Sequence, residues 1–366
     1  MNKPLNPSWP LLALAVGVFD IGMTEFTPMG LLPVIADGVG ASIPEAGMLI
    51  TAYALCVMIG APIMTLALGR IRVKTALMGI SVIGNMLAAA APGYSTLLMA
   101  RLVTSLNHGA FFGLGSVLAA SLVPKDKQAS AVAAMFLGLT IANIGGVPAA
   151  TWVGQQIGWR MAFVLTAALG VLAMAALAVT LPRGEVGKMP DVRRELRVLT
   201  RPQVLLALGT TVMGAGGMFT LYTYVAPVLQ SMTEATPNFV TLSLVIIGLG
   251  FTIGNWLGGR LADWSLDGST KLFLAALALI MLALPFVLPS KAGALLGLLV
   301  WGIATFAIVP PVQIRVMQAA AEAPGLAASV NIGAFNLGNA LGAAAGGAVI
   351  SAGWGYASVS WAGAVL

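Results

Sequence analysis

The chain has 366 residues, of which 59% are hydrophobic and only 8% are charged. A soluble domain of this length needs roughly three times as much charge to cover its surface, so that class is excluded. One cysteine excludes a disulfide framework, and one histidine excludes a histidine-built metal site. The formal net charge of +6 would favour nucleic acid binding in a soluble chain, but here the basic residues lie between long apolar runs. The composition therefore predicts a polytopic membrane protein that binds no nucleic acid, metal or cofactor.

Twelve apolar runs approach the length of about 20 residues that a helix needs to cross a bilayer core about 30 Å thick. They lie near 9–33, 45–68, 73–92, 95–122, 128–156, 160–181, 203–229, 239–261, 271–289, 291–312, 325–350 and 353–366. These runs are far longer than the strands of a membrane barrel. The first carries Asp20, Glu25 and Pro28 and lacks a strongly basic start, so we interpret it as a retained span. The last is short, and we expect the sequence given to stop before its natural end.

Lysine and arginine counts predict the orientation, because these residues concentrate in cytoplasmic loops. If the N-terminus is inside, 15 of the 18 basic residues lie on the inner side. These are Lys3, Arg70, Arg72, Lys74, Lys125, Lys127, Arg183, Lys188, Arg193, Arg194, Arg197, Arg201, Arg260, Lys271 and Arg315. The outer side receives only Arg160 and Lys291, and Arg101 lies within a span. The N-terminus and the central linker are therefore expected to be cytoplasmic.

The longest polar stretch divides the spans into two sets of six. We expect an N-terminal half at 1–182, a cytoplasmic linker at 183–202 and a C-terminal half at 203–366. Within the linker, residues 191–199 are predicted to form a short amphipathic helix on the inner membrane face. This organisation is typical of a transporter built from parallel repeats, whose substrate site lies between the halves at mid-membrane.

Several strings of the sequence resemble motifs of a known family. The string Gly259-Arg260-Leu261-Ala262-Asp263 resembles the G-x-L-A-D loop signature of the major facilitator superfamily. The corresponding loop of the first half departs from it, with Met64 and Leu68 at the expected Gly and Asp positions and only the basic cluster of Arg70 and Arg72 remaining. Longer strings are more specific: Thr24–Ala36 (TEFTPMGLLPVIA), Arg101–Val117 (RLVTSLNHGAFFGLGSV), Gly138–Phe163 and Ala328–Gly347. They are similar to the drug:proton antiporter branch, in the subgroup of arabinose or sugar efflux permeases of bacterial inner membranes.

The resemblance implies an all-α fold of twelve helices, a monomer, and alternating access coupled to the proton gradient. It also implies that Gly259, Asp263, Arg70 and Arg72 belong to loops that latch the outward-facing state. We expect the Asp263 carboxylate to cap a helix or to pair with a basic side chain.

Four ionisable residues within spans are candidates for proton coupling, since burying such groups is costly unless they are paired or functional. Glu25 is the first candidate for binding and releasing the proton; the alternative is a carboxyl bonded to a neighbouring helix for packing. Asp20 lies five residues earlier, about 140° around the helix, and therefore faces another direction. Arg101 and His108 are seven residues apart on one helix face. The resemblance implicates Arg101 in coupling, whereas the alternatives are a snorkelling arginine and a packing histidine.

The remaining candidates are uncharged. Gly145, Gly146 and Pro148 resemble a degenerate antiporter motif in the fifth span and predict a kinked helix. Tyr222 and Tyr224 are candidate aromatics of the substrate cavity, and Asn331, Asn336 and Asn339 are candidates for bonding substrate or another helix. Gly338, Gly342 and Gly346 predict a packing seam.

These features favour a proton-coupled exporter of a small organic solute or drug. The alternative is a proton-coupled uptake symporter for a sugar or nucleoside, and a membrane sensor or scaffold without transport is a third interpretation. No phosphate loop or nucleophile triad is present in the sequence, which argues against a primary pump or an enzyme.

Overall fold

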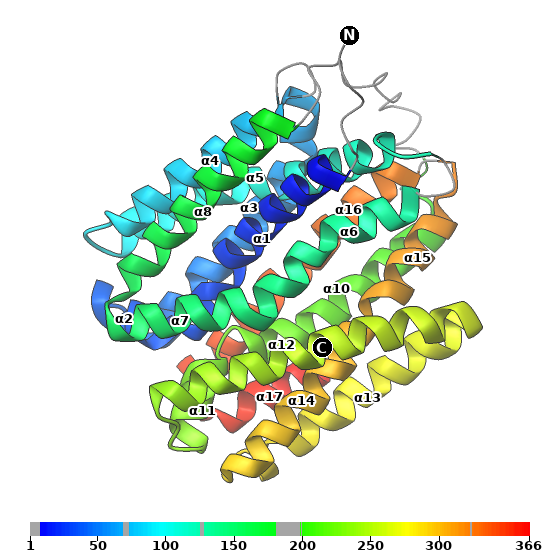
Figure 1. Ribbon diagram of the computed structural model, residues 1–366. Helices are drawn as coiled ribbons and strands as arrows, with labels where there is room; N and C mark the ends of the chain where they lie inside the picture. The colour runs from blue at the N-terminus through cyan, green and yellow to red at the C-terminus, as the bar shows by residue number, and fades with distance from the viewer. Residues whose placement is uncertain (1–7, 69–72, 125–127, 181–197, 199, 323) are drawn as a thin grey trace.

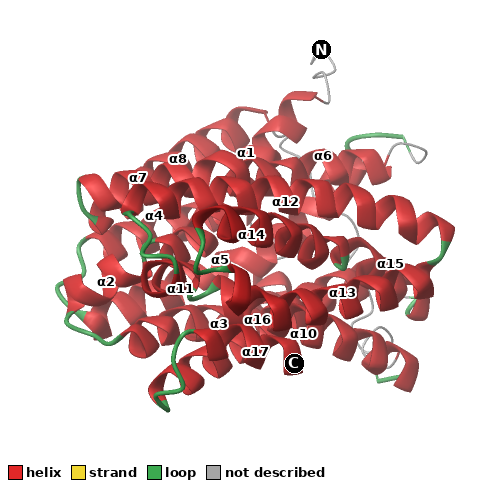
Figure 2. Ribbon diagram, turned by 90° about the horizontal axis from the view of Figure 1, so that it is seen from below, coloured by secondary structure: helices red, strands yellow, loops and turns green. Residues whose placement is uncertain are grey.

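The computed structural model describes the chain except residues 1–7, 69–72, 125–127, 181–197, 199 and 323. None of the described residues lies in a β-strand, and helices joined by short loops make up the fold (Figure 2). The prediction of an all-α membrane fold is confirmed. Arg70, Arg72 and nearly all of the predicted linker, with its amphipathic helix, lie outside the described residues.

Each predicted span coincides with one helix or with consecutive helical segments. The first half contains α1 (Ser8–Gly30), α2 (Leu32–Val39), α3 (Ile43–Leu68), α4 (Val73–Ala89), α5 (Tyr94–Ser121), α6 (Gln128–Ile141), α7 (Val147–Gln156) and α8 (Trp159–Thr180). The second half contains α10 (Pro202–Tyr222), α11 (Val225–Met232), α12 (Pro237–Trp264), α13 (Leu266–Val287), α14 (Lys291–Ala307), α15 (Val309–Ala319), α16 (Pro324–Ser351) and α17 (Ala357–Val365). Among the described residues, 8 helical stretches are both long and apolar enough to cross a membrane.

The first and seventh spans are broken at matching places. α1 ends at Gly30 and α2 continues to Val39, while α10 ends at Tyr222 and α11 continues to Met232. The predicted ends of these spans, at 33 and 229, were therefore too early. Proline accounts for part of the first break: Pro28 has no N–H to bond the carbonyl of Thr24, and Pro33 lies in the first turn of α2.

In the fifth span the helix changes locally from α to π, and the predicted glycines lie at that change. A π-helical turn occupies Ala142–Gly146, and α7 begins directly after it with Pro148 in its first turn. A π turn widens the backbone spiral by one residue and often lies near a functional site. Gly145 and Gly146 belong to this turn.

The two halves lie side by side, with the first half coloured blue to green and most of the second half below it in Figure 1. α16 packs against α3, α12 packs against α7, and α11 contacts α1 and α2. The close approach of α12 to the π turn depends on Gly248, where a side chain would overlap the Asn143 carbonyl. Within the second half, Gly338, Gly342 and Gly346 of α16 lie directly against α10.

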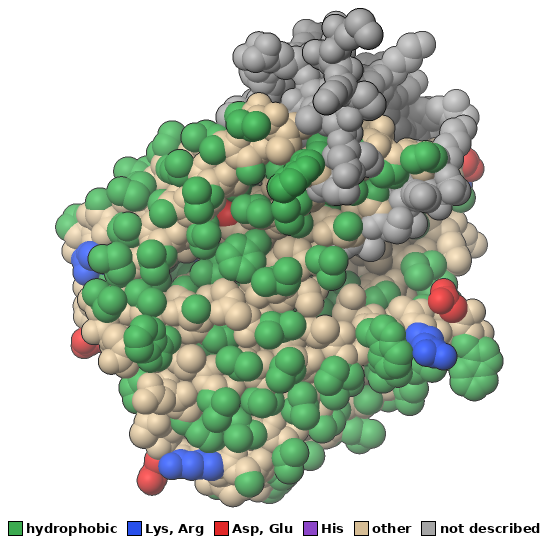
Figure 3. Space-filling model, viewed as in Figure 1, with side chains coloured by type: hydrophobic (Ala, Val, Ile, Leu, Met, Phe, Trp, Pro, Cys, Tyr) green, Lys and Arg blue, Asp and Glu red, His purple; other side chains and the backbone are tan. Residues whose placement is uncertain are grey.

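Apolar side chains are spread over the described part of the face seen in Figure 3, and few charged groups are visible on it. This distribution suits a surface in contact with lipid.

Candidate functional site

Glu25 lies on α1 where the two halves meet, and only 4% of the residue is exposed. The amide Nδ2 of Asn339, on α16 of the other half, donates to Glu25 Oε1 at 3.4 Å. Glu25 Oε2 lies 3.8 Å from His108 Nε2 of α5, and Arg101 is within electrostatic reach. One carboxyl group therefore contacts residues from both halves of the molecule.

Arg101 binds a backbone carbonyl that a proline leaves free in α1. Its Nη1 donates to the Thr24 carbonyl at 2.6 Å, which is the carbonyl that Pro28 leaves without a helical donor. The guanidinium also lies 4.1 Å from the centre of the Tyr53 ring, a cation–π distance. The residue is 1% exposed, so the alternative of an arginine that snorkels to the interface is wrong. Its Nε and Nη2 have no hydrogen-bond partner among the described residues.

His108 shares the α5 face of Arg101 and is held by an aromatic residue of α3. The Tyr53 hydroxyl lies 3.0 Å from His108 Nδ1, and the Phe112 ring packs 5.0 Å from the imidazole. If the Tyr53 hydroxyl donates to Nδ1, the proton of the neutral ring is on Nε2, which faces Glu25. Sequence reasoning missed Tyr53, although a tyrosine inside an apolar span was a usable signal.

Asp20 is buried in a different place. Its Oδ2 accepts a hydrogen bond of 2.7 Å from the Ser81 hydroxyl on α4, and its carboxyl group faces Gly170 of α8. Asn85, one turn after Ser81, bonds the Ser81 carbonyl at 3.0 Å. All of these residues belong to the first half. The structure therefore does not bring Asp20 into the cluster around Glu25, in keeping with the 140° between them.

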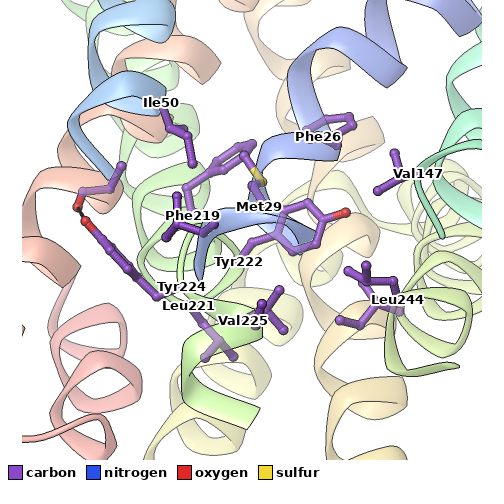
Figure 4. Packing of buried hydrophobic residues seen from close by; sticks show 14 of the residues in the cluster. Phe26, Met29, Ile50, Val147, Phe219, Leu221, Tyr222, Tyr224, Val225 and Leu244 are labelled. Carbon is purple, nitrogen blue, oxygen red and sulfur yellow. Dashed lines mark hydrogen bonds between the residues drawn. The ribbon is translucent and has the colours of Figure 1, made fainter. Parts of the chain in front are cut away.

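Tyr222 lies in an aromatic cluster between the halves (Figure 4). Its ring packs 5.7 Å from Phe26 of α1 and 6.0 Å from Trp301 of α14, and its hydroxyl lies 3.4 Å from Asn143 Oδ1 in the π turn. The indole N–H of Trp301 is buried and has no partner among the described residues. The rings of Phe26, Tyr222 and Trp301 are at most 2% exposed and pack on one another, so a solute could lie among them only after the halves separate.

Tyr224 serves the contact between the halves instead of lining the same cluster. Its hydroxyl donates to the Ala343 carbonyl of α16 at 2.8 Å. The ring is inserted between α3 and α16, at Gly47 and Gly346, where any Cβ would be too close to it. The absence of side chains at these glycines lets α3 and α16 pack around the one tyrosine at the junction of α10 with α11.

The other two asparagines of α16 have different partners. Asn331 Oδ1 accepts from the Thr211 hydroxyl at 2.7 Å, and Asn331 Nδ2 donates to Gln313 Oε1 at 2.5 Å. Thr211 also lines a small cavity inside the second half. Asn336 Nδ2 donates to Ile332 of its own helix, and Asn336 Oδ1 has no partner among the described residues.

In the loop that resembles the family signature, another acidic residue makes the contact that we expected of Asp263. Asp263 is exposed and neither caps a helix nor pairs with a basic group within the described chain. Ser265 caps α13 instead, accepting from Gly268 N at 3.1 Å, and Asp267 in the first turn of α13 pairs with Arg315 of α15. In the described part of the second half, Asp267 therefore has the contact that we expected of Asp263.

The known proteins that this chain resembles are membrane transporters. The family model described as "Major Facilitator Superfamily" matches residues 14–347. The "Inner membrane transport protein YdhP" of Escherichia coli O157:H7 is 66% identical over 98% of this chain and 93% of its own length. A "Probable sugar efflux transporter" of Mannheimia succiniciproducens is 30% identical over 97% of this chain and 90% of its own.

Among solved structures, a bacterial homologue of the human lysosomal transporter Spinster, inward-facing and occupied, is similar in fold. Its TM-score is 0.77 at 18% identity, with 96% of this chain and 83% of that chain covered.

Proposed function

This chain belongs to the major facilitator superfamily, and from that premise we propose that it is a proton-coupled efflux transporter for a small organic solute. It is a multi-pass membrane protein, and the name of its YdhP relative supports the inner membrane. The name of the Mannheimia relative supports export. We place the N-terminus and the linker in the cytoplasm, as the basic residues predict.

One observation supports proton coupling above the others: the Glu25 carboxyl is buried between the two halves and is bonded across them to Asn339. A carboxyl in that position changes its surroundings when the halves move apart. Its affinity for a proton then depends on the conformation, and proton binding in turn shifts the conformational equilibrium. We assign the coupling role to Glu25, with His108 and Arg101 as the groups that position and tune it.

The aromatic cluster around Tyr222 supports the solute class. Its rings belong to both halves, so a solute bound among them would be exposed to one side or the other as the halves rock. The cluster contains no charged side chain of its own, which favours neutral or cationic amphiphiles over polyanions.

The decisive experiment measures transport in proteoliposomes with an imposed pH gradient. Ethidium and arabinose serve as probes, one an aromatic cation and the other a neutral sugar. For an exporter, a proton gradient drives the probe in the direction opposite to the proton. Movement of probe and proton in the same direction would support the symporter. If neither probe moves, with an imposed pH gradient or in counter-flow, the result would oppose both export and uptake.

A further inference from the structure

Asn339 has an unused hydrogen-bond acceptor beside the carboxyl group of Glu25. Asn339 is 0% exposed, and its Nδ2 already donates to Glu25 Oε1 at 3.4 Å. Its Oδ1 has no partner among the described residues. A buried amide oxygen without a donor is destabilising. The described residues supply no O–H or N–H donor to this oxygen beside Glu25.

We propose that Asn339 is the residue through which the second half detects the proton on Glu25. When Glu25 is protonated, its carboxyl O–H donates to Asn339 Oδ1 while Asn339 Nδ2 donates to the other carboxyl oxygen. The two side chains then form a reciprocal acid–amide pair that joins α1 to α16. When the proton leaves, the O–H bond is lost and Asn339 Oδ1 is again without a donor. This inference rests on the proposed function and adds the partner that transmits the proton signal.

The groups around Glu25 provide a competing partner for the ionised form. The titratable and charged side chains that act on it are Tyr53 of α3, Arg101 and His108 of α5 and Tyr222 of α10. Arg101 alone carries a permanent charge, and its Nε and Nη2 are unbonded among the described residues. An ionised Glu25 is therefore drawn to Arg101, within its own half, and away from Asn339.

The exchange of partners has a mechanical consequence. The acid–amide pair connects the two halves, whereas a pair of Glu25 and Arg101 connects α1 to α5 within one half. Protonation thus stabilises the arrangement in which α1 and α16 are together, and deprotonation weakens it. A released Asn339 is also free to bond a solute, so proton and solute compete for one amide, as exchange in opposite directions requires.

The test measures the distance between the halves as a function of pH. Spin labels are placed on Asp37→Cys of α2 and Ser231→Cys of α11, both exposed and on neighbouring helices of opposite halves, in a Cys56→Ser background. The distance distribution of the purified protein in nanodiscs is recorded by pulsed electron resonance between pH 5 and pH 9. Carbodiimide labelling of protonated Glu25, read by mass spectrometry, is measured on the same samples.

We expect a short distance at low pH that lengthens as the pH rises. Asn339→Leu should abolish that change while Glu25 still loses carbodiimide reactivity as the pH rises. Asn339→Gln, which keeps the amide, should restore part of the change. Asn336→Leu is the matched control, three residues away on the same helix and bonded to that helix, and its distance change should stay like that of the parent.

An Asn339→Leu protein whose distance still changes with pH like the parent would overturn the inference and leave the proposed function intact. If carbodiimide reactivity of Glu25 does not change with pH in the parent, proton coupling at Glu25 itself fails. The two failures are therefore distinguishable on one set of samples.

Discussion

Two carboxyl groups lie five residues apart on α1, and their surroundings differ in one respect that matters. Asp20 is enclosed by α4 and α8 of its own half, with Ser81 as its hydrogen-bond donor. Glu25 lies between the halves and is bonded to Asn339 of the other half. Both residues are buried, so burial alone does not distinguish them.

This difference indicates which buried acid can couple proton binding to the relative movement of the two halves. If each half moves as a rigid body, the surroundings of Asp20 stay the same in every conformation, and its proton affinity stays the same as well. The surroundings of Glu25 change, because one of its partners moves away. Only a group whose proton affinity differs between conformations can shift their populations.

The largest expected effect is that of Glu25→Gln. The amide keeps the shape of the side chain and its bond to Asn339 but cannot titrate, so transport driven by a pH gradient should be lost. Exchange of labelled for unlabelled solute without a gradient should continue, because it needs no net proton movement. Flux assays in proteoliposomes measure both properties. A Glu25→Gln protein that accumulates solute with the pH dependence of the parent would show that Glu25 is structural.

Arg101→Lys should have the next largest effect. A lysine ammonium cannot bond the Thr24 carbonyl and stack on Tyr53 in the way that the planar guanidinium does. We expect gradient-driven flux to fall about tenfold, equivalent to about 1.4 kcal/mol. The melting temperature should fall too, because the carbonyl freed by Pro28 loses its donor. Flux equal to that of the parent would contradict the role of Arg101 in positioning the cluster.

Much of this arrangement could be predicted from the sequence, and the rest could not, for a physical reason. The hydrophobic runs indicate the helices, because spans of about 20 apolar residues have few alternatives in a bilayer. Glu25, Arg101 and His108 stood out because charge within a span is costly. Tyr53 and the pairing of Asn339 with Glu25 did not stand out. Their roles depend on contacts between spans that are far apart in the chain, and helical periodicity does not determine those contacts.

A smaller effect is expected from a methyl group at the contact between the halves. In Gly47→Ala the new methyl would overlap the Tyr224 hydroxyl, so α3 and the junction of α10 with α11 would have to separate. Overpacking of this kind costs about 1–3 kcal/mol, and here the cost falls on the closed arrangement of the halves. We expect transport to change several-fold, with longer distances between the spin labels on α2 and α11.

Gly170→Ala is the matched control for Gly47→Ala in the interior of the first half. Its methyl would lie 2.9 Å from the Val82 side chain and 3.5 Å from both Asp20 carboxyl oxygens. The strain is the same in every conformation, so thermal stability should fall while the label distances do not change. A change in those distances would show that the first half does not move as a rigid body.

His108→Gln should shift the pH profile of transport and leave solute affinity nearly unchanged. The imidazole lies 3.8 Å from Glu25 Oε2 and is bonded to the Tyr53 hydroxyl, and glutamine cannot reproduce both contacts. The substitution therefore changes the surroundings of the carboxyl group that binds the proton, and the pH profile of transport should move. Lower stability with an unshifted profile would indicate a packing histidine.

The smallest effect on coupling is expected from Asp20→Asn. Asparagine has nearly the same shape, and its Oδ1 can accept the hydrogen bond of 2.7 Å that the Ser81 hydroxyl now donates to Asp20. The neighbouring amide of Asn85 keeps its own bonds to the Thr24 hydroxyl and the Ser81 carbonyl, both at 3.0 Å. The pH profile and the number of protons moved per solute should therefore equal those of the parent, measured by a pH-sensitive dye alongside solute flux. A lower proton-to-solute ratio in Asp20→Asn would mean that a carboxyl enclosed in one half does exchange its proton during transport. That result would end the distinction between the two acids, because the first half would then have to open around α4 and α8 in each cycle.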